Sequence, residues 1–116
     1  MNITLRSTKG EPILSLNRSG ISIPDIIQQC AYKGQQLDEL LLENINFKDI
    51  NLQSLIARNS KFIKCTFDGV SFRNGDLTGT TFDNCKIDHV DVLNCSLRGA
   101  SYPNTVIGRA NPKISI

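Results

Sequence analysis

The sequence has no long apolar run, little net charge and a single histidine, and each shortage removes a class of function. No stretch approaches the roughly 20 apolar residues of a membrane-spanning helix, so we predict no contact with a membrane. The formal net charge of +2 is too small for a dedicated nucleic-acid-binding arm. Residues 1–6 lack the continuous apolar core of a secretory signal peptide, and we therefore expect a cytoplasmic location.

Residues that could carry out chemistry are scarce. The four cysteines follow no metal-binding or redox spacing, and we expect them to be reduced, as in a cytoplasmic protein. His89 lies beside Asp88 and could be matched with Ser71 or Ser96 as a hydrolytic triad, but polar residues are routine at these positions of the pattern described below. The glycines form no phosphate-binding loop. We predict no enzymatic activity, no cofactor and no metal.

What the sequence does contain is a repeat with a period of five. Every fifth residue from Leu37 to Ile107 is apolar or aromatic, and the residue two places earlier is uncharged throughout. The other three positions are mostly polar. A regular pattern of this length indicates an internal repeat, and repeats determine the architecture of a chain. The core ladder predicted from this register comprises Leu42, Phe47, Leu52, Phe62, Phe67, Phe72, Leu77, Phe82, Ile87, Val92, Leu97, Tyr102 and Ile107.

A period of five built from steps of two and three predicts a winding ribbon. Residues two apart on an extended segment point to the same side, so Cys65 and Phe67 can both face inward. The next inward residue, Val70, lies three further on, which requires the backbone to turn a corner. Residues five apart on an α-helix are separated by about 500° and drift around it, so a helix does not fit. Turn-forming pairs such as Asp68-Gly69 occur where corners are needed.

The repeat resembles the pentapeptide-repeat family, whose consensus is roughly Ala-Asp/Asn-Leu-x-x. The blocks at 45–49, 70–74, 75–79 and 95–99 carry the match. The resemblance implies an all-β solenoid: a right-handed quadrilateral parallel β-helix with four repeats per coil. Residues 35–110 would then make about 3.5 coils, each rising about 4.8 Å. The inward residues Leu40, Ile45, Ile50 and Leu55 are larger than the alanine of the family, which predicts a wider or irregular first coil.

The segments on either side of the repeat do not follow its five-residue pattern. Residues 2–7 and 12–17 alternate around a turn and predict a β-hairpin. Ser22 is a predicted helix N-cap and Gly34 a predicted helix stop, so residues 1–34 would cap the first coil. No second helix precedes the tail at 111–116. We expect either a homodimer through the C-terminal end, or a monomer in which the tail folds back over the last coil. The residues of that end are Tyr102, Ile107, Ile114 and Ile116.

The resemblance also bears on function. Some members of the family mimic duplex DNA and inhibit type II topoisomerases such as gyrase, which requires a densely negative surface. The resemblance implies a bacterial or phage protein. Because the acidic and basic residues of the repeat nearly cancel, we predict a non-catalytic interaction scaffold or inhibitor of an unidentified partner protein, with DNA mimicry against gyrase as the alternative. The predicted partner surface comprises Leu41, Ile63 and Pro103. We do not expect nucleic-acid binding, because the only basic cluster is Arg58, Lys61 and Lys64.

Overall fold

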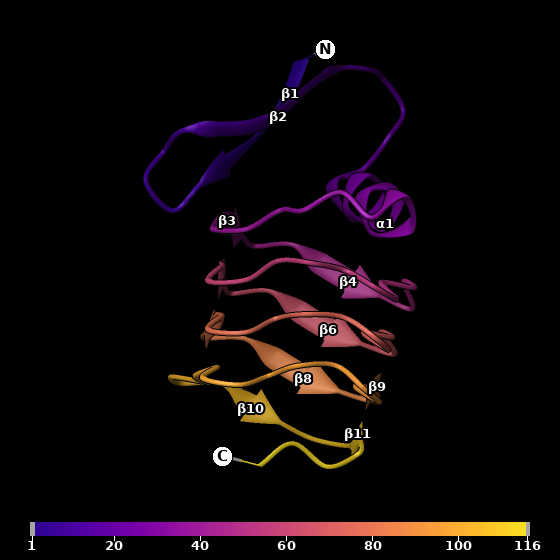
Figure 1. Cartoon of the computed structure of the whole chain (residues 1–116), viewed down its shortest axis with the longest axis vertical. Coiled ribbons are helices and arrows are strands. Elements are labelled where there is room, and N and C mark those ends of the chain that lie inside the picture. Colours follow the sequence, from indigo (N-terminus) through magenta and orange to yellow (C-terminus); the bar gives the residue numbers. More distant parts are fainter. Residues whose placement is uncertain (1, 116) are drawn as a thin grey trace.

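The computed structural model describes residues 2–115 of the chain, most of which wind into a β-solenoid of about four turns (Figure 1). Strands in successive turns pair in parallel, and each pair joins residues twenty apart. Four five-residue repeats therefore make one turn, as the resemblance implied. The strands are β3 (Leu40–Glu43), β4 (Asn46–Lys48), β5 (Lys61–Ile63), β6 (Thr66–Asp68), β7 (Thr81–Asp83), β8 (Lys86–Asp88), β9 (Val90–Asp91), β10 (Val106–Ile107) and β11 (Ala110–Asn111).

The corners of the coil are defined by one left-handed residue in every five. From position 39 to position 104, each fifth residue has a φ between +51° and +73°. Glycine adopts this region without steric cost, and asparagine and aspartate tolerate it better than other residues. Most corner positions are accordingly asparagine, aspartate or glycine, while Lys64 and His89 are among the exceptions. The turn residues thus recur at a fixed place in each repeat.

The core ladder lies along the inside of the coil. Its members from Leu42 to Val92 are buried, and Leu97, Tyr102 and Ile107 near the last turn are partly buried. Aromatic rings stack from turn to turn: Phe47 and Phe67 have ring centroids 5.0 Å apart and nearly parallel planes. Each turn therefore buries apolar surface against the next, which is how a solenoid gains its stability.

The second inward column carries hydrogen bonds between turns, which the sequence pattern did not reveal. The Thr80 hydroxyl donates to the Ala57 carbonyl at 2.7 Å and accepts from the Ser60 amide at 3.2 Å. The Ser60 hydroxyl in turn accepts from the Leu40 amide at 3.0 Å. Thr105 is bonded to the preceding turn in the same manner. These side chains pair backbone groups that the corners leave without a strand partner.

The N-terminal segment closes one end of the coil. Strands β1 (Asn2–Ser7) and β2 (Pro12–Asn17) form the expected hairpin, and β1 also pairs antiparallel with β3. The result is a five-stranded sheet in the order β2-β1-β3-β5-β7. Helix α1 (Ile23–Lys33) follows, with Ser22 as N-cap in a capping box and Gly34 in the left-handed region at its C-terminal end.

Helix α1 lies over the first turn, and its buried residues include Ile26 and Ile27 (Figure 1). The first turn keeps the same twenty-residue register as the others, as the bridge between Gln36 and Ile56 illustrates. Its pairing register is therefore regular, and the greater width expected from its large inward residues stays a prediction. Among the described residues, no helix is long and apolar enough to cross a membrane.

The C-terminal end is partly covered by the tail. Strand β11 pairs with β9 as far as Asn111, and Ile114 then packs against the core beside Leu97 and Tyr102. The remaining space among these residues is only about 10 Å³. Ile114 thus takes the fold-back position, whereas Ile116 lies outside the described residues. The homodimer stays a prediction.

Candidate interaction surface and the Asp68–Asp88–His89 cluster

The predicted partner surface lies on the outer side of the five-stranded sheet. Leu41 and Ile63 are half-buried and Pro103 is exposed. Leu41 is opposite Arg6 of the hairpin, and Ile63 is opposite Asp83 of the following turn. Pro103 comes one turn after Asp83. The three residues therefore share one side of the molecule, but charged neighbours separate them, and they do not form a continuous apolar patch.

A second surface, which the sequence reasoning missed, surrounds Tyr32 of helix α1. This side chain is 90% exposed. It borders a groove of about 330 Å³ between the helix and the coil, which is also lined by Gln28, Asn51, Gln53 and Ser54. Tyrosine is enriched at protein interfaces because it combines a large apolar ring with a hydrogen-bonding hydroxyl. The sequence could have indicated this exposed side chain, because Tyr32 lies outside the apolar stripe of the predicted helix.

Ion pairs between successive turns neutralise much of the surface charge. Arg58 contacts Asp38 at 2.7 Å, and Arg73 contacts Asp91 at 2.8 Å. The hydrogen bond from the Arg58 guanidinium, more than its charge, holds the pKa of Asp38 below its usual value. Arg58 belongs to the predicted basic cluster, so its pairing weakens that cluster further. Opposite charges are therefore mixed on these faces and form no field of one sign.

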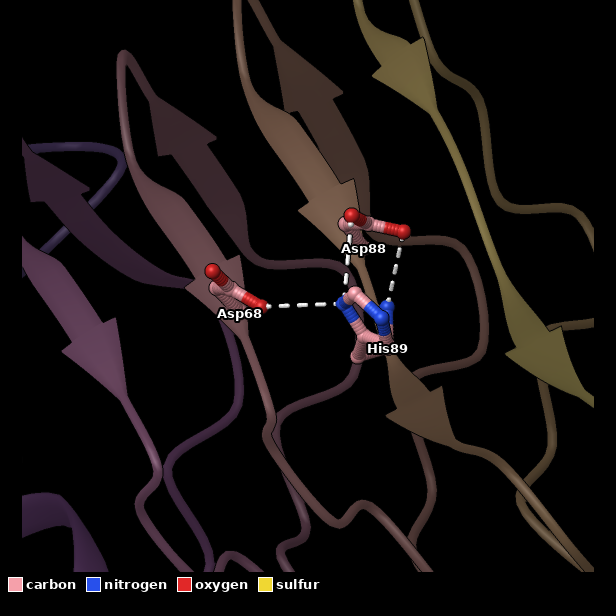
Figure 2. A group of neighbouring side chains, drawn as sticks. All are labelled: Asp68, Asp88 and His89. Atoms are coloured by element: carbon pink, nitrogen blue, oxygen red, sulfur yellow. Dashed lines mark hydrogen bonds and ion pairs between the residues drawn. The ribbon is translucent and has the colours of Figure 1, made fainter.

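Three titratable side chains meet at one corner of the coil (Figure 2). Asp68 ends β6 and Asp88 ends β8, and the parallel register places one above the other. His89 follows Asp88, and its Nδ1 atom lies 3.2 Å from Asp88 Oδ2 and 3.4 Å from Asp68 Oδ1. Figure 2 shows the imidazole turned toward both carboxylates. The His89 side chain is half-exposed, so the cluster is open to solvent.

Arg109, one turn further on, fixes the Asp88 carboxylate. The Arg109 amide donates to Asp88 Oδ1 at 2.8 Å, and its Nη2 atom lies 3.2 Å from Oδ2. The side-chain hydrogen bond from Arg109 holds the pKa of Asp88 well below its usual range. Asp88 is therefore ionised throughout the neutral pH range and is held in one orientation.

The serines that the sequence suggested as nucleophiles have other partners. The Ser71 hydroxyl accepts from the Arg73 amide at 3.4 Å, and the Ser96 hydroxyl is bonded to Thr78 at 2.8 Å. A hydrolytic triad needs the serine within hydrogen-bond reach of the histidine. In the described part of the chain, neither serine makes such a bond to His89.

The cysteines are free and face the interior. Cys65 and Cys85 are buried, and the hydrogen bond between them, together with burial, raises the pKa of the Cys65 thiol. Burial also raises the pKa of Cys95 to about 11. Cys65 and Cys95 are therefore neutral thiols at physiological pH, and a neutral thiol is a poor nucleophile and a poor metal ligand.

A family model matches this chain, and a solved structure is similar to it. A family model described as a pentapeptide repeat region matches residues 25–106. Among solved structures, the chain is similar to a pentapeptide repeat protein (Rfr23) from the cyanobacterium Cyanothece 51142, with 17% sequence identity and a TM-score of 0.41. That match covers 90% of this chain and 78% of the other. No curated protein matches the sequence significantly.

Proposed function

The chain belongs to the pentapeptide-repeat family, and on this premise we propose that it is a non-catalytic scaffold or inhibitor that binds a partner protein. The fold agrees with an interaction scaffold, but fold alone does not supply the partner, which has to be argued from the surface. The partner is expected to contact the outer side of the five-stranded sheet, at the surface comprising Leu41, Ile63 and Pro103.

The observation that carries this proposal is the extent of that sheet. It begins with the hairpin strand β2 and continues through β1, β3, β5 and β7. Its backbone is held by strand pairing on the surface and by the hydroxyl bonds of Ser60 and Thr80 beneath it. A surface that is already ordered loses little conformational entropy when a partner binds, and this favours affinity.

The alternative, a DNA-mimicking inhibitor of gyrase, has weaker support. Mimicry requires negative charge that is spaced like the phosphates of a duplex and is not neutralised by neighbours. In this chain Asp38 is neutralised by Arg58, Asp91 by Arg73 and Asp88 by Arg109. Inhibition of DNA supercoiling by gyrase at a low molar ratio of this protein would restore this alternative.

The experiment that tests the proposal compares surface variants in affinity capture from the native host, with quantification of each recovered protein. Ile63→Arg places a charge at the centre of the proposed surface, and Leu93→Arg is a matched control at a residue that is 39% exposed on another face. We expect the specific partner to be recovered with the wild type and with Leu93→Arg and to be lost with Ile63→Arg. Recovery with all three proteins would refute this placement.

A further variant separates the two surfaces. Tyr32→Ala removes the exposed ring beside the groove without touching the sheet. If the partner is lost with Tyr32→Ala and retained with Ile63→Arg, the groove at helix α1 is the binding surface and the proposal for the sheet is wrong.

A further inference from the structure

We propose that Asp68, Asp88 and His89 form a surface binding site for one divalent transition-metal ion, with Zn²⁺ the best match. The site would offer one imidazole nitrogen and one oxygen from each of two carboxylates, and these three atoms lie within 4.8 Å of one another. Zn²⁺ accepts both donor types and commonly takes three protein ligands and a water molecule. The cysteines of the sequence follow no metal-binding spacing, which argues against a site with thiolate ligands. It does not argue against a site with imidazole and carboxylate ligands.

Two distances within the cluster match the ligand sphere of a small ion. A tetrahedral ion with bonds of about 2.1 Å separates its ligand atoms by about 3.4 Å. His89 Nδ1 lies 3.2 Å from the Asp88 oxygen and 3.4 Å from the Asp68 oxygen. Each carboxylate therefore has one oxygen at coordination spacing from the imidazole nitrogen (Figure 2).

A proton alone satisfies this arrangement less well than a metal ion. Nδ1 can carry one hydrogen, and one hydrogen points well at one acceptor, whereas here two carboxylate oxygens face the same nitrogen. A metal ion would contact the nitrogen and both oxygens together. It would also offset the repulsion between Asp68 and Asp88, which the parallel register places side by side.

The fold holds one of the ligands, Asp88, in place before an ion arrives. Asp88 Oδ1 accepts the His89 amide at 3.0 Å and the Arg109 amide at 2.8 Å, while Oδ2 lies on the side of the imidazole. Such supporting hydrogen bonds orient ligands in known metal sites. Gly69, the residue after Asp68, has no side chain to crowd the corner, and a Cβ there would overlap the carboxylate of Asp49. The Asp49 carboxylate therefore lies against Gly69, the residue next to Asp68.

The donor set also limits the choice of ion. Imidazole and carboxylate together suit Zn²⁺, Cu²⁺, Ni²⁺ and Co²⁺, whereas Mg²⁺ and Ca²⁺ prefer oxygen ligands alone. The exposed position leaves the remaining coordination sites to water. Arg109 lies 3.2 Å from Asp88 Oδ2, and its positive charge restrains the affinity. We therefore expect reversible binding in exchange with solvent and no permanently bound structural ion.

The test is calorimetric titration of the tag-free chain of 116 residues with zinc chloride in a non-chelating buffer. We expect one ion per chain. His89→Asn and Asp68→Asn each remove a ligand, and their affinity should fall by more than the roughly 10-fold to 100-fold that loss of a supporting contact costs. Asp83→Asn is the matched control, because Asp83 ends β7 as Asp68 ends β6, and it should bind as the wild type does.

The His89→Asn variant is expected to fold, which keeps the test decisive. Asn44 and Asn84 hold the same left-handed corner conformation, with φ of 57° and 53°, against 51° for His89. Far-ultraviolet circular dichroism before each titration verifies this. The proposal is overturned if the wild type takes up no zinc, if His89→Asn and Asp68→Asn bind as the wild type does, or if Asp83→Asn loses affinity equally.

Discussion

Replacing Thr80 by valine tests whether hydroxyl groups inside the coil hold successive turns together. The Thr80 side chain is fully buried, donates to the Ala57 carbonyl and accepts from the Ser60 amide. Valine has nearly the same shape but makes neither bond. Two buried backbone groups that lose their partners cost about 1–3 kcal/mol each, and the added methyl group returns about 0.8 kcal/mol. We expect a net loss of about 3 kcal/mol in the free energy of unfolding.

Urea denaturation followed by circular dichroism measures this loss. Thr66→Val is the matched control, because Thr66 lies on the outer side of β6 and the same chemical change there should alter stability by less than about 0.5 kcal/mol. Thr80→Ser keeps the hydroxyl and should lose less than Thr80→Val. If Thr80→Val is as stable as the wild type or as Thr66→Val, the hydroxyl bonds do not contribute as argued.

Three further predictions address the corners, the ion pairs and the open end. Lys64→Gly should stabilise the protein by about 0.5–1 kcal/mol in thermal denaturation, because Lys64 has a φ of 54°, whereas Lys61→Gly in strand β5 should destabilise it by a similar amount. The folded-state pKa values of Asp38 and Asp88 lie below their usual value, so the stability that these two residues contribute should be complete above about pH 5 and decline as the pH falls below about 4. Urea denaturation at about pH 6 and at about pH 3 measures this decline, and an unchanged transition would contradict the prediction. If the C-terminal end forms a dimer, light scattering should give twice the monomer mass of 12.8 kDa for the wild type and the monomer mass for Ile107→Asp. A wild-type monomer at micromolar concentration would exclude the dimer.

The sequence allowed the coil to be predicted because the signal was repeated along most of the chain. The alternation of steps of two and three, seen in Cys65, Phe67 and Val70, has few solutions other than a ribbon that turns at fixed intervals. The hairpin and the helix were also predictable, since their turn and cap residues act locally. Ser22 and Gly34 take the positions at the ends of α1 that their chemistry favours.

Contacts between segments far apart in sequence could not be predicted in the same way. The pattern marked Ser60 and Thr80 only as small inward residues, because nothing in the sequence shows which carbonyl lies within reach of a hydroxyl. Similarly, the pairing of β1 with β3 depends on how the hairpin docks, which its own sequence does not specify. The meeting of Asp68, Asp88 and His89 follows from the twenty-residue register, but the sequence around His89 indicates only a polar corner residue.

The twenty-residue register has a consequence for how such a chain can change during evolution. Loss of one five-residue unit would preserve which side chains face inward, yet it would rotate everything downstream by a quarter of a turn. If the lost unit lay between Asp68 and Asp88, Asp88 would move to the neighbouring side of the molecule, away from Asp68, although both residues were retained. Duplication or loss of a whole turn would instead leave every later residue on its original side. Lengthening by complete turns is therefore the route by which this architecture can grow while each residue stays on the same side of the molecule.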